Sequence, residues 1–439
     1  MPVCKRIFKC VVRSPLIRRI LLSLSTLRLS FSEEFYSLLF DRELSLHFIC
    51  APNIFTGGPL TILMDCLASI PYEMNQRGSR VILICSSDVY HNVSLPPTVH
   101  PLCLKLSRSS WLLRLYYERI GFYILSCLCN INTWLSLHDF TSNVRAKHRV
   151  TYYHNPAPFW IPELRQIFFA PTMLLWKFLY FPLAAWGIDQ NDVLIVQQHW
   201  IKREIRKRFP KLSVLVMPPI VGKQLKTNLS LYNHRNSPTK DVLSSTLARA
   251  SMHSSHEFIF FYPCIPRVFK NIELAIESVL VARNAGFECS LLLTISGKEN
   301  LYSRFLKYRY SGNPCIKFIG YQTRLQMDAL YRSVDALLFT SLLETWGLPL
   351  SEAQSYGLPI AAIDLPYVRE AVMRYPLLFL SSVKNVIDLF GFHDLLKRDA
   401  LARHLYLSSP SQILSSEEYP EIDWDTLWQS VLGSRMPSV

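Results

Sequence analysis

The stretch DALLFTSLLETWGLPLSEAQSYGLPIAAID, residues 335–364, decides the fold class because two apolar runs enclose a short helical pattern. Its first seven and last seven residues are rich in apolar side chains, which is typical of buried parallel strands. Pro349 suits the first turn of a helix, where its missing N–H would be unpaired anyway, and Gly357 suits the left-handed residue that ends one. We therefore expect a helix over about 349–356 between two parallel strands.

The same alternation of strand and helix extends through both halves of the chain. In the C-terminal half, further elements are expected as strands at 257–264, 289–297 and 315–321 and as helices at 271–286 and 325–334. In the N-terminal half, strands are expected at 44–52, 80–87, 133–140, 150–156, 192–198 and 213–219, and a helix at 59–69. This pattern predicts an α/β protein of two Rossmann-like lobes that face each other across a cleft, with a C-terminal helical tail.

Changes in composition give the expected domain boundaries. Residues 221–256 are polar, rich in turn-forming residues and poor in large apolar ones, which indicates a linker. The predicted order is a basic N-terminal extension at 1–43, an N-terminal lobe at 44–220, the linker, a C-terminal lobe at 257–390, and the tail at 391–439.

Length and charge limit the class of protein. The chain has 439 residues, of which 18% are charged, and a net charge of +14. It is too long for one core, so two or three folded domains are expected. The positive charge favours an anionic partner, which can be a nucleic acid, an acidic lipid surface or a phosphorylated substrate. The eleven cysteines are scattered without a Cys-x-x-Cys pair, which indicates free thiols in a reducing, cytoplasmic compartment.

Two segments bear on contact with a membrane. Residues 1–30 carry seven cations and no acid, but their apolar run is short and no clean cleavage site follows, so a signal peptide is not expected. Residues 168–186 are long enough to span a bilayer, yet they contain Lys177 and two prolines. That composition favours a buried or membrane-surface helix.

Two acids flank the start of the helix expected at 349–356. Glu344 lies in the loop after the strand, and Glu352 lies within the first turn of the helix. The amides of Gly347 and Leu348 lie at the helix start, where N–H groups and the helix dipole together bind anions. A ligand with a phosphate at these amides and hydroxyls on either side fits this layout, and a nucleoside diphosphate sugar is such a ligand. The alternative is that the acids only interact with the helix dipole.

Residues 341–372 resemble the donor-binding signature of the family 4 glycosyltransferases, which are retaining enzymes of the GT-B fold. The Glu-x7-Glu motif of that family matches Glu344 and Glu352, and the resemblance extends less sharply over residues 44–390. It implies that Glu344 contacts hydroxyls of the transferred sugar and that Glu352 binds the ribose. Gly347 and Leu348 would offer their amides to the donor. The resemblance also implies that the C-terminal lobe at 257–390 binds the nucleotide sugar and that the N-terminal lobe at 44–220 binds the acceptor.

The resembled family also places a basic pair after the first strand of the C-terminal lobe, where it neutralises the diphosphate. Here the segment reads YPCIPRVFKN, and Lys270 matches the lysine. Ile265 occupies the position of the usual arginine, so Arg267 is the candidate replacement from the same loop. The chemistry needs such a cation, because the leaving diphosphate gains charge as the glycosidic bond breaks.

The N-terminal lobe offers three further candidates. Gly57 and Gly58 lie between a strand and a helix, where glycines let the backbone approach a ligand, and the resemblance assigns this loop to the donor phosphate or the acceptor. His154 matches the active-site histidine of the family and would orient the donor sugar or the acceptor. His138 and Asp139 end another strand, and either could bind or orient the acceptor hydroxyl.

No metal and no other cofactor are predicted. No Asp-x-Asp follows a strand in the pattern that chelates a divalent ion, so Lys270, Arg267 and the helix start would neutralise the diphosphate. Retention of configuration is implied by the resemblance alone. The sequence offers no second carboxylate suited to a covalent intermediate, so attack on the face of the departing diphosphate is expected.

The segment 105–125 mixes cations with aromatic residues on a helical pattern, which suits an anionic membrane surface. The sequence thus predicts a hexosyltransferase that builds a cell-surface polysaccharide, lipopolysaccharide or glycolipid on a saccharide or lipid-linked acceptor. It would work in the cytoplasm, as a peripheral protein on the inner face of the plasma membrane. An ordinary amphipathic helix with a solvated face is the alternative for this segment.

Other functions of the whole chain stay open at this point. A GT-B epimerase of sugar nucleotides would need acid and base groups at the sugar C2, and none is identified. The change to Ile265 allows a scaffold without activity, against which the intact glutamate pair argues. A nucleic-acid partner is not predicted, since no reader motif accompanies the charge.

Overall fold

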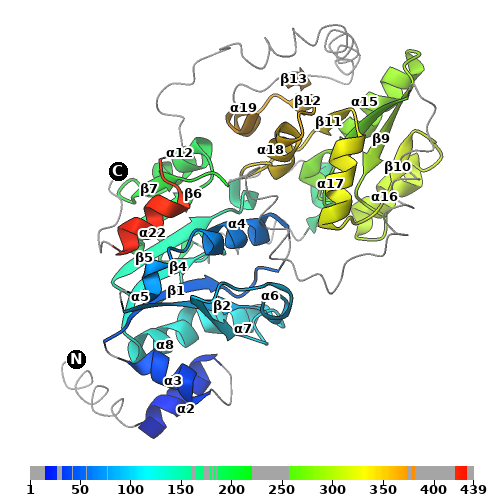
Figure 1. Cartoon of the computed structure of the whole chain (residues 1–439). Helices are drawn as coiled ribbons and strands as arrows, with labels where there is room; N and C mark the ends of the chain where they lie inside the picture. The colour runs from blue at the N-terminus through cyan, green and yellow to red at the C-terminus, as the bar shows by residue number, and fades with distance from the viewer. Residues whose placement is uncertain are drawn as a thin grey trace. The chain divides into compact units, whose positions relative to one another are not determined.

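The computed structural model describes residues 15–26, 32–41, 43–55, 57–76, 78–159, 164–171, 178, 182, 185–219, 257–372, 377–380 and 421–432. The chain forms two compact units, shown as ribbons in Figure 1, which comprise residues 1–155, 179–233 and 420–439 and residues 156–178 and 234–419. The expected linker at 221–256 lies outside the described residues, as do most of 168–186 and of the tail at 391–439.

The first unit contains a sheet of seven parallel strands in the order β3-β2-β1-β4-β5-β6-β7. The strands are β1 (Ser45–Ala51), β2 (Ser79–Cys85), β3 (Val99–Cys103), β4 (Ile131–Ser136), β5 (His148–Tyr153), β6 (Val193–Val196) and β7 (Val214–Val216). Six of the seven were expected from their apolar runs, and β3 was not. The parallel pairing confirms the prediction of a Rossmann-like lobe.

Alternate residues of β1 enter two separate cores, one on each face of this sheet. Ile49 and Ala51 pack in a core with α4 (Gly57–Ala68) and α22 (Trp424–Leu432). Phe48 and Cys50 pack in the other core, with side chains of α8 (Phe122–Leu128). Because both faces are covered by helices, the strand is apolar at nearly every position.

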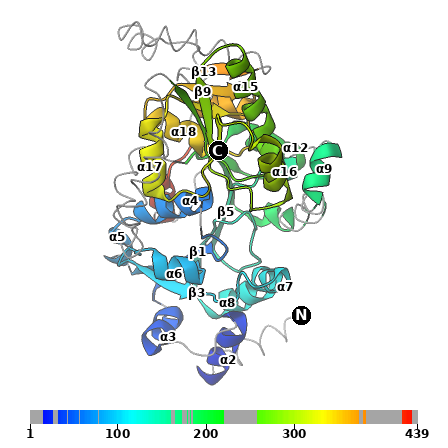
Figure 2. The same ribbon diagram turned by 90° about the vertical axis from the view of Figure 1, so that its right-hand side faces the viewer.

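Two N-terminal helices, α2 (Pro15–Thr26) and α3 (Glu33–Phe40), add to the second of these cores, and Figure 2 shows them beside α8. Leu22 and Leu39 are fully buried there. Helix α2 approaches the turn just before α8 so closely that a side chain at Gly121 would collide with the carbonyl oxygen of Ser25. The described part of residues 1–43 is therefore packed onto the first unit.

The C-terminal helix α22, red in Figure 1, also belongs to the first unit. The Trp424 ring stacks on Tyr152, with centroids 5.6 Å apart, and Trp428 donates its indole N–H to the carbonyl oxygen of Cys66 at 3.3 Å. Glu421, just before the helix, pairs with Lys202. These contacts attach α22 to the sheet of the first unit, which is built from residues 45–216.

The second unit contains six parallel strands in the order β10-β9-β8-β11-β12-β13. They are β8 (Phe258–Tyr262), β9 (Cys289–Leu293), β10 (Ile316–Phe318), β11 (Ala336–Phe339), β12 (Ile360–Ile363) and β13 (Leu377–Leu380). The helices are α15 (Ile272–Asn284), α16 (Leu301–Tyr310), α17 (Arg324–Ser333), α18 (Leu348–Ser355) and α19 (Pro366–Val372). The prediction of a second Rossmann-like lobe is confirmed, and α16 is an addition to it.

Among the described residues, no helix is long and apolar enough to cross a membrane. The nine cysteines in this part of the chain are free thiols.

Candidate functional site

The strand order places one switch point in each sheet. In the second unit the chain builds outward from β8 to β9 and β10 on one side, and then returns to place β11 on the other side. In the first unit the same reversal occurs between β1 and β4. Open parallel sheets bind ligands at the carboxyl ends of the strands beside such a point. The loops after these four strands carry most of the predicted site residues.

Lys270 and Glu344 meet at the switch point of the second unit. Lys270 ends a 3₁₀ turn, Val268–Lys270, in the loop after β8, and Glu344 lies in the loop after β11. The Lys270 ammonium forms an ion pair with the Glu344 carboxylate, and their side chains are 14% and 15% exposed. The backbone between the two loops is also joined, because the Leu342 N–H donates to the Phe269 carbonyl at 2.7 Å. The two expected donor-site residues are thus neighbours, although 74 positions separate them in the sequence.

Helix α18 begins one residue earlier than expected. Gly347 precedes it with φ of 84°, and Leu348 and Pro349 form its start, so Glu352 lies in its second turn rather than its first. A side chain at Gly347 would be strained by this φ, and its Cβ would lie 3.0 Å from Leu350 Cδ1. The backbone therefore requires glycine at this position. Gly357 ends the helix with φ of 70°, as expected.

Glu352 is held by two residues of α17. Arg324 at the start of that helix forms an ion pair with Glu352 Oε1, and the Tyr331 hydroxyl donates to Oε2 at 2.7 Å. Burial opposes the charge of Arg324, but the Glu352 carboxylate outweighs it and raises the pKa of the guanidinium. Burial and Glu352 together raise the pKa of Tyr331 well above its ordinary value, so its hydroxyl stays a donor. A carboxylate has about four acceptor positions, so two remain for a ligand.

Arg267 is exposed and forms no ion pair with any described residue. Its carbonyl accepts the backbone N–H of Lys270 at 2.9 Å, which places it at the start of the same turn. Ile265, at the position where the resembled family has arginine, is 64% exposed. The loop after β8 therefore presents one cation that is paired and another that faces solvent.

Gly57 and Gly58 open helix α4 just after β1, at the switch point of the first unit. Gly57 has φ of 68°, a conformation that residues with a side chain rarely adopt. No atom lies within 4 Å of the place that a Cβ of Gly57 would occupy. The requirement for glycine here comes from the backbone and not from crowding.

His154 follows β5 and is held by Asp139 from the loop after β4. The Asp139 carboxylate accepts the backbone N–H of His154 at 2.6 Å, and its second oxygen lies 3.7 Å from His154 Nε2. Burial lowers the pKa of His154, an effect that Asp139 opposes, so the ring is neutral near pH 7. His138 is only 3% exposed, and both ring nitrogens are hydrogen-bonded inside the unit, to Cys50 O and to Glu118. Its ring is therefore not available to an acceptor.

Three residues at these sites were not expected from the sequence. Arg324 and Tyr331 lie on a helix whose pattern was recognised, but their contact with Glu352 depends on how that helix packs. Glu118 lies in a segment that was interpreted only as amphipathic. For none of them does a local motif indicate the role.

The comparison with protein families gives one match, in which residues 250–386 align with the family described as glycosyl transferases group 1. These residues form a group 1 glycosyltransferase domain. The domain contains Lys270, Arg267, Glu344 and Glu352, and it supports what the resemblance of residues 341–372 implied. The chain is thus a glycosyltransferase that takes its sugar from a nucleotide-sugar donor. A search of curated proteins gave no match.

Solved glycosyltransferases share the fold of this one. Sucrose-phosphate synthase from Thermosynechococcus elongatus is 14% identical, with a TM-score of 0.55 over 82% of this chain and 92% of that one. WaaG, a glycosyltransferase involved in lipopolysaccharide biosynthesis, is 11% identical, with a TM-score of 0.51 over 83% and 93%. HepE from Anabaena, in complex with UDP and glucose, is 14% identical, with a TM-score of 0.52 over 88% and 98%. At these identities the similarity establishes the GT-B fold and not the substrate.

Proposed function

We propose that the second unit holds the nucleotide-sugar donor and that the first unit receives a saccharide acceptor, with retention of the anomeric configuration. The observation that carries this proposal is the pairing of Lys270 with Glu344 at the switch point, beside the helix that bears Glu352. One cation and two carboxylates at the ends of neighbouring elements match a ligand that has both a diphosphate and sugar hydroxyls.

Each donor-site residue has a separate proposed role. Lys270 stabilises the charge that develops on the leaving diphosphate, and the exposed Arg267 binds the same group from solvent. Glu344 accepts hydroxyls of the transferred sugar, and Glu352 accepts those of the ribose. The amides of Gly347 and Leu348 contact the donor at the start of α18, where the helix dipole favours an anion.

In the first unit, Gly57 and Gly58 let the backbone approach the donor phosphate or the acceptor. His154 orients the transferred sugar or the acceptor hydroxyl, because its neutral ring offers both a donor and an acceptor of hydrogen bonds. We further propose that no metal ion takes part, since Lys270, Arg267 and the start of α18 supply positive charge to the diphosphate.

The acceptor is proposed to be lipid-linked and used at the inner face of the plasma membrane, for a surface polysaccharide such as lipopolysaccharide or a glycolipid. Helix α2 supports this, because Leu16, Ile20 and Leu24 are 67%, 51% and 51% exposed. Their spacing of four places them on one side of the helix. Trp111 and Leu112 of α7 (Trp111–Tyr116) are exposed as well. The net charge of +14 adds attraction to anionic lipids.

A panel of nucleoside diphosphates tests the donor site through thermal unfolding. UDP, GDP, ADP and dTDP are added at equal concentration, with and without EDTA. One of them is expected to raise the midpoint by several degrees, since saturation at about 100 times Kd adds about 2.7 kcal/mol. Glu352→Gln should reduce the shift, EDTA should not, and the exposed Glu277→Gln of the same unit serves as the matched control. Absence of any shift in the folded protein would contradict the proposal.

Vesicle binding tests the membrane part. Ile20→Glu combined with Leu24→Glu adds charge to the exposed side of α2 and leaves the buried Leu22 in place. Binding to vesicles that contain anionic lipids at low salt should fall, while Tyr308→Glu, at a still more exposed position of the second unit, should bind as the wild type does. Equal binding of all three proteins would rule out a membrane role for α2.

A further inference from the structure

A fully buried carboxylate in the first unit has no part in the roles given above. Glu118 is 0% exposed and lies in a π-helical turn, Tyr117–Gly121, between α7 and α8. Burial of a carboxylate is costly unless it is paired and hydrogen-bonded. Turns of the π type are rare, and they are frequently found at functional sites. The cost of burial and the unusual turn together suggest a functional reason for this residue, which its contacts reveal.

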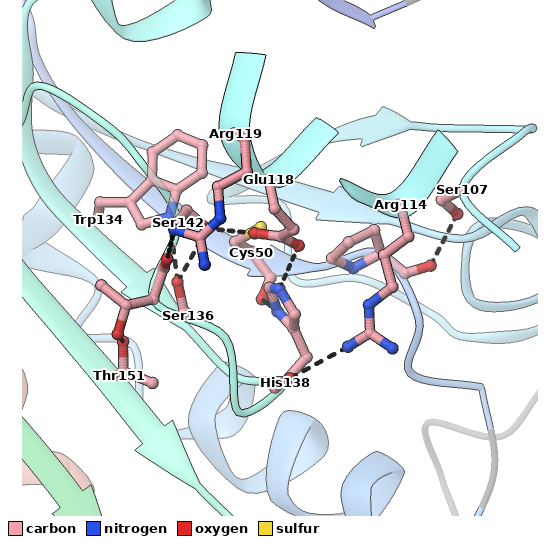
Figure 3. A network of polar contacts seen from close by, with 12 residues as sticks. Cys50, Ser107, Arg114, Glu118, Arg119, Trp134, Ser136, His138, Ser142 and Thr151 are labelled. Atoms are coloured by element: carbon pink, nitrogen blue, oxygen red, sulfur yellow. Dashed lines mark hydrogen bonds and ion pairs between the residues drawn. The ribbon is translucent and has the colours of Figure 1, made fainter. Parts of the chain in front are cut away.

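Glu118 is bonded at three points to the loop that follows β4, and Figure 3 shows its side chain facing His138 and Ser142. Its Oε1 lies 2.6 Å from His138 Nε2, and its Oε2 accepts the Ser142 hydroxyl at 2.8 Å. Its backbone carbonyl accepts the N–H of Asn143 at 2.9 Å. All three hydrogen bonds run to residues 138–143, so they fix the turn against the loop.

The proton between Glu118 and His138 can be placed from the partners of the ring. His138 Nδ1 lies 2.8 Å from the Cys50 carbonyl oxygen, which only accepts, so Nδ1 carries a proton. Burial opposes the charge of Glu118, but the contact with His138 outweighs it and lowers the pKa of the carboxyl. The short contact is therefore a hydrogen bond between the His138 ring and the Glu118 carboxylate, and hydrogen bonds to a charged group are stronger than neutral ones.

The loop that Glu118 holds also holds His154. Asp139, next to His138, has φ of 69°, which is uncommon for a residue other than glycine and persists only where the surroundings impose it. Its carboxylate accepts the backbone N–H of His154 at 2.6 Å. A continuous series of contacts thus leads from Glu118 through His138 and Asp139 to His154.

We propose that Glu118 is a positioning residue, which through His138 keeps Asp139 in its left-handed conformation and so sets the orientation of His154. This rests on the proposed function in one respect, which is that His154 acts on the donor sugar or the acceptor. Glu118 itself touches no substrate in this account.

The same cluster has a second chemical interpretation. One atom each of Cys50, Glu118 and His138 lie within 4.8 Å of one another, a spacing that suits a metal ion. A metal bound to His138 Nε2 would have to replace the contact of that nitrogen with Glu118 Oε1, which is 2.6 Å long. Burial also raises the pKa of the Cys50 thiol well above its ordinary value, which opposes the thiolate that a metal prefers. The hydrogen-bonded arrangement is therefore the one proposed, and metal content is part of the test.

The test compares three variants in the full-length protein. Glu118→Ala removes the contacts, and Glu118→Gln keeps the shape and can still bond to a neutral His138 and to Ser142. Lys202→Met, the matched control, removes a different ion pair of the same unit. Protein labelled with ¹⁵N-histidine reports the amide and ring signals of His154 without any ligand. Turnover is followed as release of UDP from UDP-glucose.

Glu118→Ala is expected to shift the His154 signals and to lower kcat about 100-fold, the effect of misplacing a group by about 1 Å, with little change in KM. The His154 signals and the kcat of Glu118→Gln should lie between those of Glu118→Ala and those of the wild type. Lys202→Met should lower only the unfolding midpoint. If Glu118→Ala does not fold, the Gln variant gives the same comparison over a smaller range.

Unchanged His154 signals in Glu118→Ala, or unchanged kcat per folded molecule, would overturn the proposal. So would one equivalent of bound metal in the wild type that is lost from the variant. The His154 signals decide the positioning role even if the wild type does not release UDP from UDP-glucose, whereas failure of the proposed function would be seen as the absence of a thermal shift with every nucleoside diphosphate.

Discussion

The two switch points of the molecule carry acid–base pairs of opposite character. In the second unit the side chains of Lys270 and Glu344 are 14% and 15% exposed. In the first unit those of His138 and Glu118 are 3% and 1% exposed. A residue of a partly exposed pair can give up its partner and bind a ligand instead. A residue of a fully buried pair can only hold other residues in place. In the roles proposed here, the same position in two similar sheets serves binding in one unit and positioning in the other.

The largest expected effect is that of Lys270→Met on turnover. Loss of one fixed positive group at a developing charge typically lowers kcat by about 10²–10³. UDP release from UDP-glucose measures it, and Arg267→Met of the same loop is the control. Arg267 is exposed and has no ion-pair partner among the described residues, so its loss should have a smaller effect. Equal losses in both variants would mean that the partly exposed pair is not the principal diphosphate site.

Acid should destabilise the first unit more than the second. Burial, with a smaller effect of His148, lowers the pKa of His47 to about 4. The unfolded chain takes up this proton near pH 6.5 and the folded one does not, so stability falls as the pH decreases between these values. From pH 7 to pH 5 the free energy of unfolding should fall by about 2 kcal/mol through His47 alone. The described part of the second unit contains no histidine.

Urea unfolding at the two pH values measures this difference. His47→Gln should reduce the acid sensitivity, and the part that remains is expected from His154, His100 and His148, whose pKa values burial also lowers. His91→Gln, at an exposed position, should keep the sensitivity of the wild type. Glu118 does not contribute in this range, because its lowered pKa gives stability that is lost only below about pH 4.5. Equal acid sensitivity of the wild type and His47→Gln would contradict the assignment.

The smallest expected effect concerns Tyr331, one of the two residues that hold Glu352. Tyr331→Phe removes one hydroxyl from a buried hydrogen bond, whose net value is about 1 kcal/mol. The affinity for the nucleoside diphosphate should therefore fall by roughly fivefold, as measured by calorimetry. Tyr310→Phe, which removes a similar bond to Glu277, is the control and should bind as the wild type does. An unchanged affinity in Tyr331→Phe would show that Glu352 needs no support from the Tyr331 hydroxyl.

Most strands could be predicted because their apolar runs report burial on both faces of a sheet. Strand β3 could not, since its sequence VHPLC contains His100 and Pro101, which is tolerated at the edge of the sheet where β3 lies. Helix α16 was missed because lysine and arginine interrupt its apolar positions. A local signal was present there, as Asn300 and Ser303 form a capping box.

The site could be predicted only where one loop contains it. The glycine at Gly347 and the acids at Glu344 and Glu352 follow from a single short stretch. The partners of those acids do not, because Arg324 and Lys270 lie 28 and 74 positions away and reach them through the packing of other elements. Glu118 is the extreme case, since a buried glutamate and a solvated one look the same in a helical pattern.

The central claim is that Lys270 and its neighbours bind the diphosphate of a nucleotide-sugar donor. Calorimetry should compare the nucleoside diphosphate that gives the largest thermal shift with its parent nucleoside, in the wild type and in Lys270→Met. The account predicts that the diphosphate binds more tightly than the nucleoside in the wild type. In Lys270→Met the ratio of the two affinities should fall by at least about tenfold, or about 1.4 kcal/mol. An identical difference in the two proteins would contradict it.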